Sequence, residues 1–466
     1  MIDKREILDQ ATATGLNPHV VEKDYVLGWL LWGVANHEAT ADNWIFKGGT
    51  CLKKCFFETY RFSEDLDFTL TDPAHLDEDF LRNVFTDISV AVYDRTGIEI
   101  PVDRHRFDLY PNPRGHVSCQ ARIPYRGPVS PPSLPRVKFD LTADELVVLP
   151  PVRLRVFHPY GDEPADGITV SSYTYEEAFA EKTRALGERA RPRDLYDVVN
   201  LFRHVDTRPK PAVLFDVLRR KCAFKDVEPP AYDRLAQARD ILEGSWSQML
   251  GHQLRMLPPF EGFWEELPAF LAWLETGLPP RAPAPFARAP GEEVVRGRVV
   301  RLPPSIPFPA RAALQGQLDV IRFAATNRLC VDLLYQGSTR RIEPYSLRRT
   351  QEGNVILHAH NRDKNAHRSY RLDRIQGARV TDQSFTPRFA VELSPSDPVS
   401  VPPTAPRPPS VRTHRRRSDG PTHVYECAYC GKRFYRKTRT RRLNKHKDKT
   451  GYPCSGRSAH YIDTRY

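Results

Sequence analysis

Two proline-rich stretches divide this sequence of 466 residues, and they restrict its fold more than any other feature. They span residues 277–310 and 393–421, and both lack the periodic apolar positions of packed helices or strands. Such a composition is typical of extended linkers. We therefore predict three separate pieces, over residues 1–276, 311–392 and 422–466.

The composition also bears on where the protein works. The chain has no run of 18 apolar residues, so we expect no membrane-spanning helix and no membrane partner. Its first residues, "MIDKREILDQ", are charged and contain no signal-peptide core. Its eight cysteines are too few and too scattered for a disulfide scaffold. These features predict a cytoplasmic protein.

The first piece mixes helices and strands. A helix is predicted from Pro18 over "PHVVEKDYVLGWLLWGVANHE", and two short strands, "NWIFKGG" and "EDLDFTLT", flank a glycine turn. A third strand is predicted in "LPRVKFDLTADELV", where Val137, Phe139 and Leu141 alternate with polar residues. From residue 175 to 276 the apolar spacing becomes helical. We predict an α+β domain with a small sheet followed by a helical bundle.

Two aspartates, Asp65 and Asp67, are separated by one leucine in the second predicted strand. Side chains two apart on a strand project from the same face, and no cationic partner is evident between them. A divalent cation would relieve their repulsion, and Mg²⁺ prefers such oxygen ligands. Asp140, on the polar face of the third predicted strand, is the candidate third carboxylate of a two-metal site for phosphoryl transfer. The alternative is a solvated strand face.

Gly48, Gly49 and Thr50 directly follow the first predicted strand. Paired glycines let the backbone approach a bulky anionic ligand, and the threonine adds a hydroxyl donor. A plain turn would explain the glycines alone. Their position ahead of the two aspartates, framed by strands, favours a nucleotide-binding site that also holds a metal ion.

This order of features resembles that of the polymerase-β-like nucleotidyltransferases. Several blocks resemble the AbiEii/AbiGii-type toxin family more closely: "VEKDYVLGWLL", "FKGGTCLKK" with "RFSEDLDF", "EEAFAEKTRALGERARPRDLYDVVNL", and "WSQMLGHQL" with "PFEGFWEELPAFLAWL". The resemblance covers about residues 15–276. It implies a polymerase-β-like core with a helical bundle and an NTP-dependent nucleotidyltransferase activity.

The resemblance also implies functions for single residues in the nucleotide-binding region. It places the phosphate-binding turn on Gly48, Gly49 and Thr50, a triphosphate contact on Lys53 with Lys54 beside it, and supporting functions on Arg61 and Ser63. An exposed helix face is the alternative for the two lysines.

A later block supplies further catalytic candidates. The functional lysine of the family falls on Lys182, which would stabilise the charge that develops on the triphosphate. A functional aspartate falls on Asp194, which would pair with Arg189 or Arg193 or act as a base towards an acceptor hydroxyl. Asp197, one turn later, is a second candidate. The alternative for Asp194 is a carboxylate stabilised by the helix dipole.

The second piece, over residues 311–392, predicts a short helix followed by the strands of a small β-barrel. The blocks "RIEPY" and "YRLDRI" resemble a WYL domain, an Sm-like barrel, although "VIL" replaces the tripeptide that names it. The resemblance implies binding of a nucleotide or single-stranded nucleic acid by stacking and by a basic rim, with the candidates Tyr345, Arg368, Tyr370 and Arg371. The alternative is a barrel that only packs against the catalytic domain.

The third piece contains three cysteines and a histidine with metal-ligand spacing: Cys427, Cys430, His446 and Cys454. This set suits tetrahedral Zn²⁺, with His460 as an alternative to His446, and so short a piece needs such a metal to fold. Residues 407–466 hold 17 Lys/Arg and 4 Asp/Glu, and a basic helix is predicted in "RKTRTRRLNKHKDK". This charge favours a zinc-finger-like module that binds nucleic acid, and a disordered, solubilising tail is the alternative.

Together these features predict a Mg²⁺-dependent nucleotidyltransferase that moves a nucleotidyl group from an NTP to an acceptor such as the 3′ end of tRNA. The nucleic-acid partner would be tRNA, another RNA or DNA. The resemblance implies a toxin–antitoxin or phage-defence role, with an antitoxin as a separate protein. The alternatives are a nucleic-acid-binding regulator with an inactive transferase fold and a structural component of a defence complex. A regulator would have little reason to keep Asp65 and Asp67 in mutual repulsion.

Overall fold

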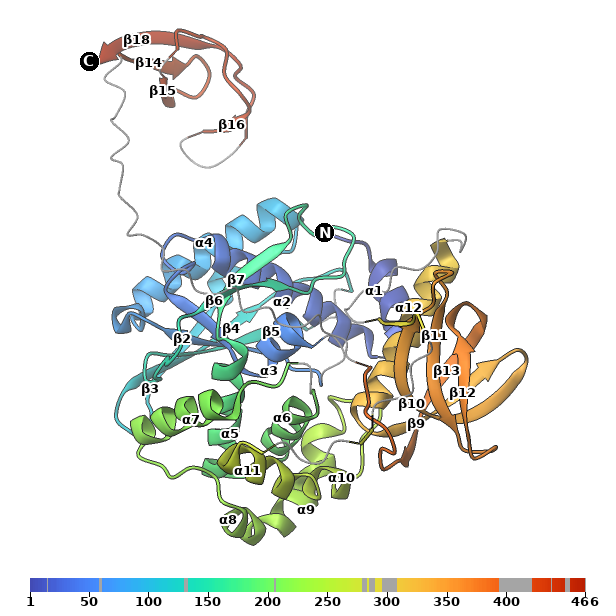
Figure 1. Cartoon of the computed structure of the whole chain (residues 1–466). Coiled ribbons are helices and arrows are strands. Elements are labelled where there is room, and N and C mark those ends of the chain that lie inside the picture. Colours follow the sequence, from blue (N-terminus) through green and yellow to red (C-terminus); the bar gives the residue numbers. More distant parts are fainter. Residues whose placement is uncertain are drawn as a thin grey trace. The chain divides into compact units, whose positions relative to one another are not determined.

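The structure is a computed structural model that describes residues 1–14, 16–57, 61–129, 133–204, 207–278, 283–284, 290–295, 308–393, 421–436, 438–448 and 453–465. The chain forms two compact units, Met1–Ser400 and Val401–Tyr466, and each is described by itself (Figure 1). Among the helices of the described residues, none combines the length and apolarity needed to span a bilayer.

A mixed sheet of seven strands forms the first part of the larger unit. Its strands are β1 (Trp44–Lys47), β2 (Asp65–Leu70), β3 (Arg106–Pro111), β4 (Val117–Pro124), β5 (Arg136–Thr142), β6 (Val152–Val156) and β7 (Ile168–Ser172). They lie in the order β3-β4-β5-β2-β1-β7-β6. β2 runs antiparallel to β1 and parallel to β5.

The three predicted strands, β1, β2 and β5, are confirmed and lie side by side in the middle of this sheet. In β5 the side chains of Val137, Phe139 and Leu141 are buried, as the alternation predicts, while Lys138 and Asp140 point to the other face. The edge strand β3 exposes most of its side chains, so its sequence carries little sign of a half-buried strand. The other edge strand, β6, alternates exposed arginines with the less exposed Val152, Leu154 and Val156.

Helices cover the sheet and continue beyond it. α1 (Lys4–Thr14) packs on α2 (Pro18–Asn36), and α2 packs on α4 (Glu78–Thr96) and β7. The predicted start of α2 is confirmed, because Pro18 occupies its first turn and the Asn17 side chain accepts a hydrogen bond from the His19 backbone. Short turns complete this region: α3 (Gly48–Cys51), the π-helical turn η1 (Leu52–Phe56), η2 (Pro73–His75) and η3 (Val102–Arg104).

The predicted helical bundle follows β7 directly, in green and yellow-green in Figure 1. It consists of α5 (Tyr175–Arg189), α6 (Pro192–Arg203), α7 (Pro211–Lys225), α8 (Tyr232–Gln237), α9 (Arg239–Leu250), α10 (Glu261–Trp264) and α11 (Leu267–Thr276). Thr174 caps α5 by accepting a hydrogen bond from the Glu177 backbone, and α6 begins with Pro192. The described fold is therefore of the α+β class, as predicted.

The larger unit ends with a small antiparallel barrel-like sheet, orange in Figure 1. The helix α12 (Phe308–Thr326) precedes the sheet. The sheet contains β9 (Leu329–Tyr335), β10 (Ser338–Arg349), β11 (Val355–Asn361), β12 (Ala366–Arg371) and β13 (Ile375–Ser384), with the turn η4 (Leu372–Arg374) before β13. A short strand, β8 (Glu293–Val294), pairs with the end of β10. β8 and the first residues of α12 lie in the predicted linker 277–310, so part of that stretch belongs to the barrel.

The smaller unit is built from short strands. β14 (Thr422–Cys427), β15 (Arg433–Arg436) and β18 (Ala459–Arg465) form one sheet, and β16 (His446–Lys447) pairs with β17 (Pro453–Cys454). The basic helix predicted over 436–449 is wrong for the described residues of that stretch. Leu443 is its single apolar residue, and it packs into a small core with the cysteines. One apolar residue does not form the stripe that a helix buries.

Candidate functional site

The acidic residues predicted as metal ligands meet on one face of the large sheet. Asp67 of β2 lies opposite Asp140 of β5, and Asp65 lies opposite Lys138. On the other side of β2, Lys47 of β1 lies opposite Asp67. Paired residues of neighbouring strands point to the same face, as do residues two apart on one strand. The strand register therefore gathers three carboxylates and two lysines on one face. We call this face, with Asp65, Asp67 and Asp140, the acidic face.

Cations lie close to these carboxylates, although no cationic partner was evident in the sequence. Lys138 Nζ is 2.6 Å from Asp140 Oδ2 and 3.9 Å from Asp65 Oδ2. Lys47 affects the titration of Asp67 and is itself held by Glu181 at 3.4 Å. The spacing of Asp65 and Asp67 alone could not reveal these lysines, because both belong to neighbouring strands.

Burial and mutual repulsion shape the titration of the acidic pair. The pKa of Asp67 rises to about 6, first through burial and then through Asp140, while Lys47 and Lys182 oppose the rise. The pKa of Asp65 is also raised, chiefly by burial, against the opposing charge of Lys138. A bound cation would lower both values, because it favours the ionised carboxylates.

The two glycines make room for the protein's own side chains. Gly48 has a φ of +81°, and a Cβ atom added there would lie 2.1 Å from Asp67 Oδ2. A Cβ atom added to Gly49 would lie 2.8 Å from Arg61 Nη2 and 3.0 Å from Ser63 Oγ. The Thr50 hydroxyl donates to the backbone carbonyl of Asp65. The turn is thus tied directly to the strand that carries the carboxylates.

Lys182 is held beside the acidic face by a buried ion network. Its Nζ lies 2.8 Å from Asp197 Oδ2, and Asp197 also accepts hydrogen bonds from Arg61 Nε at 2.7 Å and Nη2 at 2.8 Å. Arg61 Nη1 donates to Gln253 Oε1 at 3.0 Å. Burial raises the pKa of Asp197, but Arg61 and Lys182 outweigh it and hold that pKa well below its usual range.

Comparison with known protein families assigns the chain to a family. The model of the family described as nucleotidyl transferase AbiEii toxin, type IV toxin–antitoxin system, matches residues 29–276, more than half of the chain. The chain belongs to the AbiEii nucleotidyltransferase toxin family. The model of the WYL domain matches residues 316–380, within the barrel.

The AbiEii chain is thus a nucleotidyltransferase with an appended WYL domain. Among solved structures it is similar to MenT4, a nucleotidyltransferase toxin from Mycobacterium tuberculosis. That similarity has 18% sequence identity and a TM-score of 0.37, and it covers 59% of this chain and 90% of that chain. A search of curated proteins finds no match.

Within this AbiEii nucleotidyltransferase, Asp194 and Asp197 occupy different surroundings. Asp194 is buried, and both its carboxylate oxygens accept hydrogen bonds from Arg189, at 2.8 and 2.9 Å. The pairing with an arginine, one of the two predicted arrangements, is the one found. Asp197, and not Asp194, forms the ion pair with Lys182, at 2.8 Å.

The predicted triphosphate lysines lie in a separate buried cluster of the AbiEii domain. Lys53 pairs with Asp24, Lys54 Nζ lies 2.7 Å from Asp24 Oδ2, and the Tyr160 hydroxyl donates to the same oxygen at 3.1 Å. Both lysines are buried, so the alternative of an exposed helix face is wrong. A triphosphate contact by Lys53 does not fit this arrangement, since its ammonium is occupied by Asp24. Sequence reasoning missed Asp24, whose signal is a carboxylate that lies, with Glu22, in an otherwise largely apolar helix.

The predicted stacking residues of the WYL domain are not available on its surface. Tyr345 is fully buried, and its hydroxyl donates to Glu343 Oε2 at 2.9 Å. Tyr370 is also buried and accepts a hydrogen bond from Asn361 Nδ2 at 3.1 Å. Stacking of a base on these two rings is therefore excluded in this conformation, whereas Arg368 and Arg371 remain at least partly exposed.

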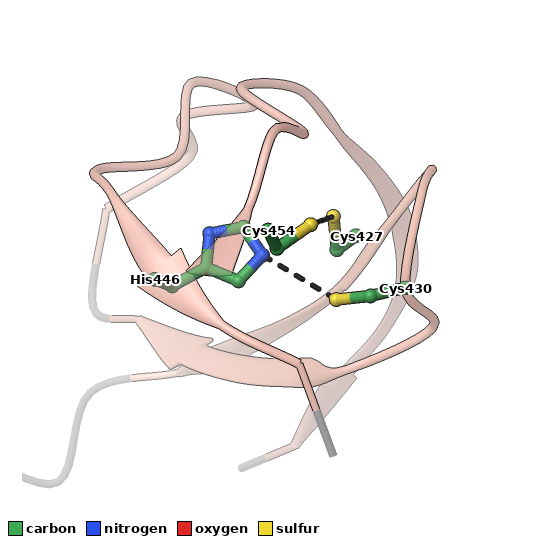
Figure 2. A group of neighbouring side chains, drawn as sticks. All are labelled: Cys427, Cys430, His446 and Cys454. Atoms are coloured by element: carbon green, nitrogen blue, oxygen red, sulfur yellow. Dashed lines mark hydrogen bonds between the residues drawn. The ribbon is translucent and has the colours of Figure 1, made fainter. Parts of the chain in front are cut away.

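The predicted zinc ligands of the AbiEii chain converge in the smaller unit (Figure 2). One ligand atom from each of Cys427, Cys430, His446 and Cys454 lies within 4.8 Å of the others. Cys427 Sγ is 3.9 Å from Cys454 Sγ, and Cys430 Sγ is 3.4 Å from His446 Nε2. Three thiols and an imidazole at this spacing fit tetrahedral Zn²⁺. His460 is exposed on β18 and lies outside the cluster.

Proposed function

We propose that this chain is a Mg²⁺-dependent nucleotidyltransferase that transfers a nucleotidyl group from an NTP to a hydroxyl group of RNA, with the 3′ end of tRNA as the acceptor. The observation that carries the proposal is the strand register that gathers Asp65, Asp67 and Asp140 on one face, next to Lys182. In such a transfer the acceptor oxygen attacks the α-phosphorus, and pyrophosphate leaves.

The acidic face fits Mg²⁺. Its donors are carboxylate oxygens, and the burial and repulsion that raise the pKa of Asp67 support binding of a positive charge there. Mg²⁺ bound by Asp65 and Asp67, with Asp140 as the third carboxylate of the site, would act as a Lewis acid on the phosphoryl oxygens.

The remaining residues would bind and orient the triphosphate. Lys182, held by Asp197, presents its ammonium near Asp67 and would stabilise the charge that develops on the phosphates. Gly48, Gly49 and Thr50 begin the short helix α3 directly beside the carboxylates, so their backbone and Ser63 would line the phosphate-binding side of the site.

The zinc module would hold the RNA. Its described residues include a dense set of basic side chains: Lys432, Arg433, Arg436, Arg439, Arg441, Arg442, Lys445 and Lys447. Tyr429 and Tyr435 are 79% and 59% exposed, which is unusual for aromatic rings. Exposed aromatic rings among cations suit the bases and phosphates of a single strand. Zn²⁺ would act as a structural ion in this module.

The family also suggests the biological setting. Its description as part of a type IV toxin–antitoxin system supports a toxin that works in the cytoplasm and is counteracted by a separate antitoxin protein. A contribution to phage defence is part of the same proposal.

The test is transfer of a radiolabelled nucleotide. The purified chain, Mg²⁺ and each of the four α-³²P-labelled NTPs are incubated with total tRNA, alongside Asp65→Asn and the matched control Asp79→Asn, an exposed aspartate of α4. We expect label on tRNA with the wild type and the control only. Label on the protein would show that the acceptor is the protein itself rather than RNA. RNA binding without transfer by any variant would support the regulator alternative.

A further inference from the structure

One cation is built into the acidic face by the strand register itself. Lys138 lies directly opposite Asp65 on the neighbouring parallel strand and two residues before Asp140 on its own strand. Its ammonium therefore lies on the same face as all three carboxylates. The ammonium lies 2.6 Å from Asp140 and 3.9 Å from Asp65, so it bridges these two carboxylates.

Asp140 is occupied by protein donors on both of its oxygens. Lys138 Nζ contacts Oδ2, and the Gln120 side chain on β4 donates to Oδ1 at 3.3 Å. The Gln120 amide is oriented in turn, because its own oxygen accepts a hydrogen bond from Arg122. Asp140 thus belongs to a hydrogen-bonded chain of side chains that runs across β4 and β5.

A like charge lies on one side of the Lys138 ammonium. In the register of β4 and β5, Arg122 lies opposite Lys138, on the side away from Asp65. Arg122 is a cation that pairs with Asp108 on β3. A lysine that turned away from the carboxylates would meet this like charge, so the electrostatic surroundings favour its position between Asp140 and Asp65.

We propose that Lys138 is a positioning residue that supplies one of the positive charges of the acidic face. The site then takes a single divalent cation, at Asp65 and Asp67. The ion pair of Lys138 and Asp140 stands in place of a second metal ion. The inference rests on the proposed function, since it presumes that the acidic face binds a metal ion. It departs from the two-metal site expected from the sequence.

The test counts bound metal ions rather than turnover. Binding of Mn²⁺, which accepts the same oxygen ligands as Mg²⁺, is measured by electron paramagnetic resonance on the full-length, zinc-loaded chain without nucleotide. The wild type is compared with Lys138→Met and Lys138→Arg, and with Lys364→Met, which removes one exposed lysine from the barrel. Thermal unfolding with and without Mn²⁺ establishes that each variant folds.

We expect one Mn²⁺ per chain for the wild type, Lys138→Arg and Lys364→Met, and a second Mn²⁺ for Lys138→Met. Lys138→Met should also gain more thermal stability from Mn²⁺ than the wild type does, because its carboxylates lack their internal cation. Two Mn²⁺ in the wild type, or an unchanged count in Lys138→Met, would overturn the proposal.

Two further variants separate this inference from the proposed function. Asp140→Asn should keep the first Mn²⁺, and its loss would identify Asp140 as an obligatory metal ligand, contrary to the proposal. Asp65→Asn should lose that ion whether or not Asp140 is a metal ligand. A wild type that binds no Mn²⁺ at all would refute the metal-dependent function itself.

Discussion

Single residues at the site are explained by the atoms that surround them. Gly48 has a left-handed backbone, and the Asp67 carboxylate lies where a Cβ atom would be. Any other residue at this position would therefore have both backbone strain and a steric clash. Gly97, which ends α4, has a similar φ of +80° but open space around it. The two glycines allow the backbone cost and the steric cost to be separated.

We predict that Gly48→Ala lowers nucleotidyl transfer at least about tenfold, because the new methyl group displaces Asp67. Gly97→Ala should lose only about 1 kcal/mol of unfolding free energy from the backbone strain and keep its transfer rate. Chemical denaturation and the radiolabel assay measure both quantities. Equal transfer rates for the two variants would show that the contact with Asp67 is unimportant.

We also predict different effects for the two aspartates of α6. Asp197→Asn leaves Arg61 and Lys182 without their shared anion, so it should lose about 3 kcal/mol of stability and roughly 100-fold in transfer rate. Asp194→Asn affects Arg189, which is 46% exposed and can be hydrated. Its transfer rate should fall much less. A larger loss of kcat for Asp194→Asn would reverse the assignment.

At the scale of elements, the smaller unit depends on its ligand cluster. Its hydrophobic core consists of Tyr425, Leu443, Ala459 and two of the cysteines, with Cys430 and Phe434 packed against them. So few apolar side chains cannot offset the conformational entropy of a module of this size.

We therefore predict that Cys430→Ser, or removal of zinc by a chelator, unfolds residues 421–466 and leaves the larger unit folded. Zinc content by atomic absorption should fall by one ion per chain, and limited proteolysis should then remove the smaller unit. Cys55→Ser, a half-buried cysteine of the larger unit, is the matched control. Protease resistance that survives complete loss of zinc would contradict a structural role for the metal.

At the scale of the larger unit, α6 joins the candidate active site to the WYL domain. Its Asp197 holds Lys182, and Arg203 in its last turn donates to the backbone carbonyl of Thr326, at the end of α12, at 3.2 Å. His204 follows at once and stacks on Phe57 with ring centroids 4.3 Å apart. The barrel is thus packed against the catalytic domain through Arg203, and the next residue along the chain is a buried histidine.

We predict that this histidine makes the larger unit sensitive to acid. Burial, then Arg328 and Arg203, lower the pKa of His204 to about 3, whereas an unfolded histidine titrates near about 6.5. As pH falls below about 6.5 the unfolded chain takes up a proton that the folded chain does not, so stability decreases by up to about 1.4 kcal/mol per pH unit. His204→Phe keeps the stacking and should flatten this dependence between pH 6 and about 4.

Urea denaturation at a series of pH values measures the effect, and His116→Phe, an exposed histidine, is the control. Identical pH profiles for the wild type and His204→Phe would show that other groups cause the acid sensitivity.

Local patterns in the sequence were enough to predict several features. The alternation in β5, the proline at the start of α2 and the spacing of the zinc ligands each depend on a few neighbouring residues, and the structure contains all three. The acidic pair on β2 could be predicted for the same reason, because the period of a strand determines which side chains share a face.

Only the tertiary structure decided which charges meet. Lys138 reaches Asp65 through the register of two parallel strands, and Lys53 reaches Asp24 through the packing of the π-helical turn against α2. Asp197 rather than Asp194 holds Lys182, because the rotation of α6 against α5 turns that carboxylate towards the site. Contacts between distant segments depend on how whole elements pack, and the period of one segment contains no information about that packing.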